Sequence, residues 1–266
     1  MGRLRIDELF RTRGKRPVLV AYLTIGEPSV DESVACALAA LEAGADLLEL
    51  GVPFSDPTAD GPVIAAASYR AIRRGGSLRA ALGAAATIRA KSAAPLVLFT
   101  YYNPIVAFGE AEVARAAARA GVDAFLVVDL PPEEGATLRD ACESEAIAMI
   151  PLVAPTTDKE REPRVLARAS GFVYYVSVTG VTGSTKAPLA DAGLAAAELR
   201  ARAGLPVVVG FGIRTPEQAR SVARAGVDGI VVGTEIVRVM AQAESPEARR
   251  AAVRSLVAGL RAGLDA

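Results

Sequence analysis

The chain has 266 residues, of which 52% are hydrophobic and 23% are charged. Thirty basic side chains balance thirty acidic ones, so the net charge argues against a nucleic-acid-binding surface or a polybasic membrane patch. The length fits a single α/β barrel with a large core.

Cysteine and histidine usage further restricts the chemistry. The chain contains no histidine, and Cys36 and Cys142 lie far apart in alanine-rich segments. We therefore expect buried reduced thiols, with no disulfide and no metal site. The N-terminus lacks the apolar core of a signal peptide, and no apolar run reaches membrane-spanning length, so we expect a soluble, cytoplasmic protein.

Short apolar runs alternate with amphipathic segments along the chain. Residues 1–13 predict a helix with Leu4, Leu9 and Phe10 on its apolar side, covering the bottom of the fold. The apolar runs are continuous, which is typical of strands buried on both faces. They predict eight strands, at 18–23, 46–50, 96–101, 124–129, 148–153, 172–176, 206–210 and 229–232. Helical patterns cover 33–42, 111–120, 132–145, 158–169, 216–225 and 245–264.

Three similar turns join helices to strands. Residues 43–46 read AGAD, and residues 120–123 and 225–228 both read AGVD. In each, glycine suits the left-handed C-cap that ends a helix. The repetition predicts one (β/α)₈ TIM barrel over residues 1–266, with an extra N-terminal helix. A doubly wound open sheet is the alternative, but residues 23–28 (LTIGEP) have one glycine where a glycine-rich dinucleotide turn would be expected.

The most informative segment is residues 49–61, ELGVPFSDPTADG. Glu49 stands at the end of an apolar strand, and Asp60 lies on the rigid loop that follows. A carboxylate in such a place is commonly a cap or part of an ion pair. No Lys or Arg occurs between Glu42 and Arg70, so local ion pairing does not explain these acids. Burial raises a carboxyl pKa, so Glu49 can serve as an acid near neutral pH.

Polar and glycine-rich segments follow other strands, at the barrel end where such folds carry their chemistry. The long loop after residue 176 contains Gly180 and Gly183 and has the composition of a mobile lid. Residues 210–212 (GFG) and 233–234 (GT) stand where barrels bind phosphate, through backbone N–H groups and a helix N-terminus. The alternative is that these glycines are only tight turns.

These segments together resemble the tryptophan synthase alpha subunit family. The resemblance rests on residues 48–62 (LELGVPFSDPTADGP), 100–104 (TYYNP), 180–183 (GVTG), 210–213 (GFGI), 216–218 (PEQ) and 232–233 (VG). They occur in family order over nearly the whole chain, and the first is nearly diagnostic. The resemblance implies a lyase that cleaves indole-3-glycerol phosphate to indole and glyceraldehyde 3-phosphate.

The resemblance also implies the residue roles. Glu49 would protonate C3 of the indole ring and then act as the base on the glycerol hydroxyl, while Asp60 would stabilise the indole N–H. Tyr174 would pack near Glu49, Thr182 would reach Asp60, and Phe211 with residues such as Leu126 would sandwich the indole. The phosphate would be held by Gly183, Gly212, Gly233 and Thr234. Thr234 replaces a serine common in the family, and Val178 an arginine found in some members.

The family resemblance implies a partner as well. This is a beta subunit that carries pyridoxal phosphate, in an alpha2beta2 hetero-tetramer with a tunnel for indole; no cofactor is expected in this chain. The expected contact surface is the rim formed by residues 53–57, 103–104 and 131–132. Two alternatives stay open: a free-standing indole producer, and a catalytically inactive activator of the partner.

Overall fold

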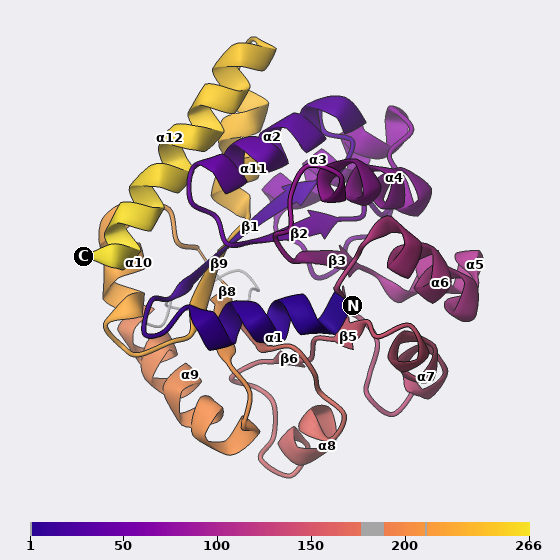
Figure 1. Cartoon of the computed structure of the whole chain (residues 1–266), viewed down its shortest axis with the longest axis vertical. Helices are drawn as coiled ribbons and strands as arrows, with labels where there is room; N and C mark the ends of the chain where they lie inside the picture. The colour runs from indigo at the N-terminus through magenta and orange to yellow at the C-terminus, as the bar shows by residue number, and fades with distance from the viewer. Residues whose placement is uncertain (1, 177–188, 211) are drawn as a thin grey trace.

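The computed structural model describes residues 2–176, 189–210 and 212–266. Within them, parallel strands form a central ring surrounded by helices (Figure 1). The strands are β1 (Val18–Thr24), β2 (Leu47–Gly51), β3 (Leu96–Thr100), β4 (Ala124–Val127), β5 (Ala148–Met149), β6 (Leu152–Val153), β7 (Val173–Val176), β8 (Val207–Gly210) and β9 (Gly229–Val232). Their order in the sheet is β5-β4-β3-β2-β1-β9-β8-β7-β6.

Hydrogen bonds around β5 and β6 close the ring. The Ile150 N–H donates to the Phe125 carbonyl of β4 at 2.9 Å, and the Tyr174 N–H of β7 donates to the Pro151 carbonyl at 3.0 Å. The sequence predicted one strand over 148–153, whereas the structure divides it into β5, which pairs with β4, and β6, which pairs with β7. Together β5 and β6 fill one position of the ring. The barrel has eight strand positions, and the open-sheet alternative is wrong.

The helices follow the predicted alternation with some differences. They are α1 (Gly2–Thr12), α2 (Val30–Glu42), α3 (Pro62–Arg73), α4 (Leu78–Arg89), α5 (Tyr102–Phe108), α6 (Glu110–Ala120), α7 (Ala136–Ser144), α8 (Glu162–Leu166), α9 (Leu189–Ala203), α10 (Pro216–Ala223), α11 (Thr234–Gln242) and α12 (Pro246–Asp265). The predicted helix 158–169 shrinks to α8, which starts at Glu162 because Pro163 is tolerated only in the first turn of a helix. Across the described ranges, no helix is long and apolar enough to cross a membrane.

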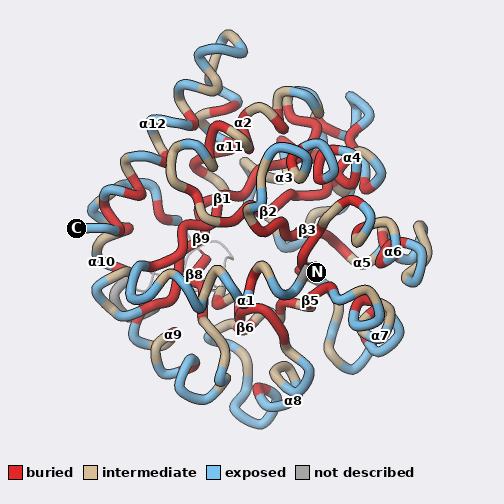
Figure 2. Tube along the Cα trace, in the orientation of Figure 1, coloured by how far each residue is buried: buried red, intermediate tan, exposed pale blue. Residues whose placement is uncertain are grey.

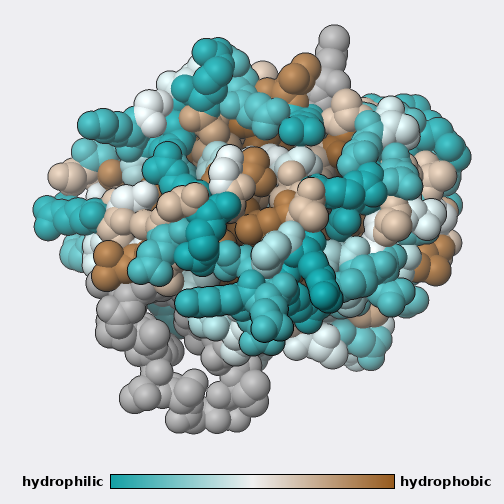
Figure 3. All heavy atoms as spheres, turned by 90° about the horizontal axis from the view of Figure 1, so that it is seen from below, coloured by the Kyte–Doolittle hydropathy of each residue, from teal (hydrophilic) through white to brown (hydrophobic). Residues whose placement is uncertain are grey.

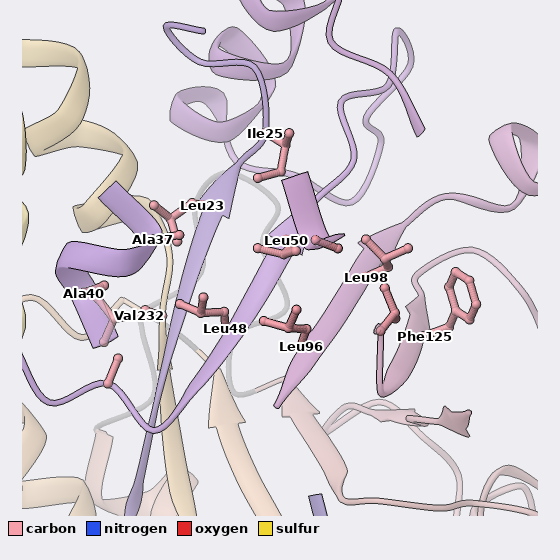
Figure 4. Packing of buried hydrophobic residues seen from close by; sticks show 14 of the residues in the cluster. Leu23, Ile25, Ala37, Ala40, Leu48, Leu50, Leu96, Leu98, Phe125 and Val232 are labelled. Atoms are coloured by element: carbon pink, nitrogen blue, oxygen red, sulfur yellow. The ribbon is translucent and has the colours of Figure 1, made fainter. Parts of the chain in front are cut away.

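Two hydrophobic layers hold the barrel together. Strand residues such as Leu48, Leu50 and Leu98 face outward and pack in the larger layer, which lies between the sheet and the helices (Figure 4). Alternate residues, including Leu47, Val97 and Leu126, fill the barrel interior. Buried residues follow the central ring, while the helices expose their outer faces (Figure 2). The side of the barrel in Figure 3 is mainly hydrophilic, with a group of hydrophobic residues near its centre.

Helix α1 lies across one end of the ring, as expected (Figure 1). Ile6 is fully buried there, and the Phe10 and Phe172 ring centroids are 5.7 Å apart. The prediction that Leu4 belongs to the apolar side is wrong, because Leu4 is 66% exposed. Ile6 takes that place, since it lies on the same helical face as Leu9 and Phe10, three and four residues later.

The three repeated turns gather at this same end. Gly44, Gly121 and Gly226 have positive φ angles of 107°, 78° and 83°. Gly121 is the left-handed C-cap of α6, as predicted, whereas the C-caps of α2 and α10 are Ala43 and Arg224, shortly before their glycines. The aspartate after each turn accepts a backbone N–H from a neighbouring strand: Asp46 from Leu19 (2.8 Å), Asp123 from Leu96 (2.7 Å) and Asp228 from Val207 (2.8 Å). Each also pairs with arginine, as Asp123 does with Arg5 and Arg89.

Candidate active site

Glu49 lies in the middle of β2 and faces the barrel interior. The register pairs it with Tyr22 of β1 and Val97 of β3. Its side chain is 0% exposed, and neither carboxyl oxygen has a hydrogen-bond partner among the described residues. Burial raises the pKa of Glu49 to about 8, because desolvation destabilises the charged form of the carboxyl group. At neutral pH, Glu49 therefore holds a proton.

Asp60 lies on the loop between β2 and α3 and is half-buried. Burial raises its pKa to about 6, and a hydrogen bond with the Tyr101 side chain opposes that shift. The Tyr101 hydroxyl also accepts the Ala59 N–H at 3.0 Å, and the Tyr101 ring packs on Phe54 with centroids 5.0 Å apart. Tyr101 thus fixes the loop that carries Asp60, and Asp60 is mainly ionised at neutral pH.

A cavity of about 550 Å³ brings the predicted residues together at the C-terminal ends of the strands. Its lining includes both acids and four of the predicted binding residues: Glu49, Asp60, Tyr174, Gly212, Gly233 and Thr234. The remaining predicted residues Thr182, Gly183 and Phe211, together with Val178 and Gly180, lie outside the described residues. The volume is in the range of small-molecule sites.

The apolar wall of the cavity differs from the prediction in one residue. Leu126 is fully buried in the barrel interior and does not line the cavity. The wall is formed instead by Ile64, Phe99, Val128 and Leu152. Val128 follows Leu126 by two residues on the inward-facing side, so it stands one layer nearer the mouth. Counting every second residue along the strand, from the level of Glu49 toward the C-terminal end of the barrel, could have identified Val128.

Two tyrosines line the floor of the cavity beside Glu49. A Cβ atom on Gly51 would lie 2.2 Å from the Tyr22 hydroxyl oxygen, and one on Gly210 would lie 2.1 Å from that of Tyr174. Glycine is therefore required at both positions for these hydroxyls to fit. Burial raises the pKa of both tyrosines, so they stay neutral. Sequence reasoning missed Tyr22, although it lies directly opposite Glu49.

The other end of the cavity has the features of an anion site. Gly233 is the N-cap of α11 and Thr234 is its first helical residue, so the first N–H groups of the helix have no acceptor within it. The helix dipole adds partial positive charge there. Gly212 has φ +52°, a left-handed conformation that glycine adopts readily. Over the described part of the chain, no group of three or more His, Cys, Asp or Glu side chains could hold a metal ion.

Comparison with known proteins identifies the family. Residues 10–264 match the family model for the tryptophan synthase alpha chain. The chain belongs to this family. The alpha chain of Citrifermentans bemidjiense is 48% identical over 246 residues, which cover 91% of each chain. Tryptophan synthase subunit alpha from Legionella pneumophila has a TM-score of 0.90 at 33% identity, over 98% of both chains. A chain of M. tuberculosis tryptophan synthase in its aminoacrylate-bound form has a TM-score of 0.87 at 33% identity, over 98% of this chain and 99% of that one.

Family membership confirms the expected fold and reaction class. The barrel is a TIM barrel, and the chain is a lyase of tryptophan biosynthesis that cleaves indole-3-glycerol phosphate to indole and glyceraldehyde 3-phosphate. As an alpha chain it implies a beta-chain partner.

Proposed function

We propose that Glu49 and Asp60 carry out this cleavage as a pair with opposite protonation states. The observation that carries the proposal is the fully buried Glu49 carboxyl, which has no partner among the described residues and a pKa of about 8. Asp60 lines the same cavity with a pKa of about 6. Near pH 7 one group is an acid and the other a carboxylate, as separated pKa values allow.

The steps follow from these two states. Glu49 donates its proton to C3 of the indole ring, and the ring nitrogen becomes positively charged. The Asp60 carboxylate stabilises the N–H bearing that charge. Glu49, now ionised, removes the proton from the glycerol hydroxyl next to the ring. The oxygen electrons form the aldehyde, the carbon–carbon bond breaks, and its electron pair returns to the indole, leaving Glu49 protonated again.

The cavity supports a matching substrate orientation. The indole ring would lie against the apolar wall of Ile64, Phe99, Val128 and Leu152, with Tyr174 beside Glu49. The phosphate would lie at Gly212, Gly233 and Thr234, where backbone N–H groups and the α11 dipole favour an anion. By the family resemblance, Thr182, Gly183 and Phe211 would complete these contacts.

We propose no cofactor for this chain, because carboxyl groups can carry out both proton transfers. We treat residues 1–266 as one catalytic domain working in the cytoplasm. Pyridoxal phosphate would belong to the beta subunit, joined in an alpha2beta2 hetero-tetramer. The proposed contact surface is the rim of residues 53–57, 103–104 and 131–132, beside the cavity mouth. Ser55, Asp56, Asn103 and Pro131 are exposed there.

A Glu49→Gln variant tests the catalytic roles. The amide cannot donate or accept the proton in the same way, so indole release should fall by about 10²–10⁴-fold. Activation of the beta subunit should persist, because the rim is unchanged. Glu112→Gln on the exposed face of α6 is the matched control and should cleave normally. Cleavage at the normal rate by Glu49→Gln would refute the acid role.

Steady-state rates with and without the beta subunit separate the alternatives. Strong activation by the partner is expected for a two-component synthase. A fast rate for the chain alone, unchanged by the partner, would indicate a free-standing indole producer. Partner activation without any cleavage by the wild-type chain would indicate an inactive activator.

A further inference from the structure

The charges around the cavity are unbalanced for a phosphate ester. Its described lining carries three acidic side chains, Glu49, Asp60 and Glu235, and one basic side chain, Arg214. Backbone N–H groups bind phosphate but bring no net charge, while Asp60 is mainly ionised at neutral pH. Glu49 is protonated at neutral pH and Glu235 pairs with Arg238, so a phosphate dianion in this cavity would meet the charge of Asp60. Arg214 is the basic side chain of the described lining that can offset this charge.

We infer that Arg214 is a specificity-determining residue that binds the substrate phosphate and compensates this charge; the inference rests on the proposed phosphate site. Arg214 lies in the loop between β8 and α10, two residues after Gly212. Its side chain is exposed and lines the cavity mouth together with Gly212, Gly233 and Thr234. A guanidinium matches the geometry of phosphate oxygens and can bind two of them at once.

The backbone that carries Arg214 is held in place. The Arg214 N–H donates to the Gln218 side-chain oxygen at 2.8 Å. Thr215 is the N-cap of α10, and its side chain forms a reciprocal capping box with Gln218. The preceding residue, Ile213, is buried. Because the residues on both sides of Arg214 are held in place, its Cα has a defined position at the cavity that Gly233 and Thr234 of the α11 N-terminus also line.

Glu235 lines the same cavity and feels the charge of Arg214, but it already has a hydrogen-bond partner. Glu235 accepts a hydrogen bond from the Arg238 side chain at 2.9 Å. That hydrogen bond is the main cause that lowers the pKa of Glu235, and the charge of Arg214 contributes less. Arg238 thus pairs with Glu235. Among the described residues the Arg214 guanidinium forms no ion pair, so it is available to an anion in the cavity.

The test compares Arg214→Gln and Arg214→Lys with Arg224→Gln. Arg224 is the exposed C-cap of α10, the helix that follows Arg214, and it lies outside the cavity lining. Arg224→Gln removes the same charge as Arg214→Gln without changing the cavity. The readouts are titration of the whole chain with glyceraldehyde 3-phosphate and with indole, and steady-state cleavage. Binding of the phosphate product at low salt should weaken about tenfold in Arg214→Gln. KM should rise similarly with little change in kcat.

Two internal checks make the result specific. Indole carries no charge, so its binding should be the same in all variants. Added salt should narrow the difference between wild type and Arg214→Gln, since it screens an exposed cation. Arg214→Lys should recover part of the affinity, and Arg224→Gln should match wild type.

Two outcomes would overturn the inference in distinguishable ways. Equal affinity of wild type and Arg214→Gln for glyceraldehyde 3-phosphate would remove the role of Arg214 and leave the proposed function intact. Failure of the wild type to bind this phosphate, while it still binds indole, would remove the proposed phosphate site and the inference with it.

Discussion

Two acidic residues of one short segment, Asp46 just before β2 and Glu49 in its middle, have opposite surroundings. Asp46, just before β2, accepts the Leu19 N–H and pairs with Arg16 and Arg261 at 3.0 and 3.1 Å. Glu49, three residues later, has no hydrogen-bond partner within the described chain. A buried charge is stable when it is paired, whereas an unpaired carboxyl keeps its proton. The bottom of the barrel uses acids for structure, and the top keeps one as an acid.

Asp123 shows that burial alone does not make a catalytic acid. Burial raises its pKa, but the Leu96 N–H and the side chains of Arg5 and Arg89 oppose that shift. For Glu49, burial is the cause of the pKa shift to about 8, and no described residue forms a hydrogen bond that opposes it. The difference between Asp123 and Glu49 lies in the hydrogen-bond and ion-pair partners around each carboxyl group.

A matched pair of substitutions should separate the two ends. Asp60→Asn should slow cleavage by about 10²–10³-fold with little loss of stability, because it removes the charge that stabilises the transition state. Asp123→Asn should lower the free energy of unfolding by about 3 kcal/mol, because two partly buried arginines lose their partner. Its folded fraction should cleave at close to the wild-type rate. Chemical denaturation measures the loss of stability, and indole release measures the cleavage rate. A slow but stable Asp123→Asn together with an active but unstable Asp60→Asn would contradict the assignment of Asp123 to structure and Asp60 to catalysis.

The pH dependence of cleavage should give a smaller effect that reports the protonation states of Asp60 and Glu49. Cleavage requires Asp60 ionised and Glu49 protonated, so kcat/KM should fall about tenfold per unit below pH about 6 and above pH about 8. In Asp60→Asn, the residual activity should lose the acidic limb and keep the alkaline one. Activity that stayed constant up to pH 10 would contradict a required proton on Glu49.

The sequence predicted the barrel because buried parallel strands leave a direct pattern of continuous apolar runs. Glycine turns such as 120–123 marked the repeated units. Helix ends were harder, since Pro163 shortens α8 in a segment whose apolar pattern still suggests a longer helix. The segment 148–153 was predicted as one strand, but its divided pairing between two neighbours depends on how the ring closes.

The acids of the site were also predictable, because ELGVPFSDPTADG combines a strand end with an acid-bearing rigid loop. The layer occupied by each wall residue was not, since it depends on barrel register. Leu126 and Val128 lie on the same inward-facing side, and only the register decides which one reaches the cavity. Tyr22 was missed because its run, like other buried strands, carries no polar motif.

An infrared titration of the Glu49 carboxyl in the whole chain tests the central claim most directly, with isotope editing and Glu49→Gln as the reference. The structure predicts a protonated carboxyl at pH 7 that titrates near pH 8. An ionised carboxylate already present at pH 6 would contradict it.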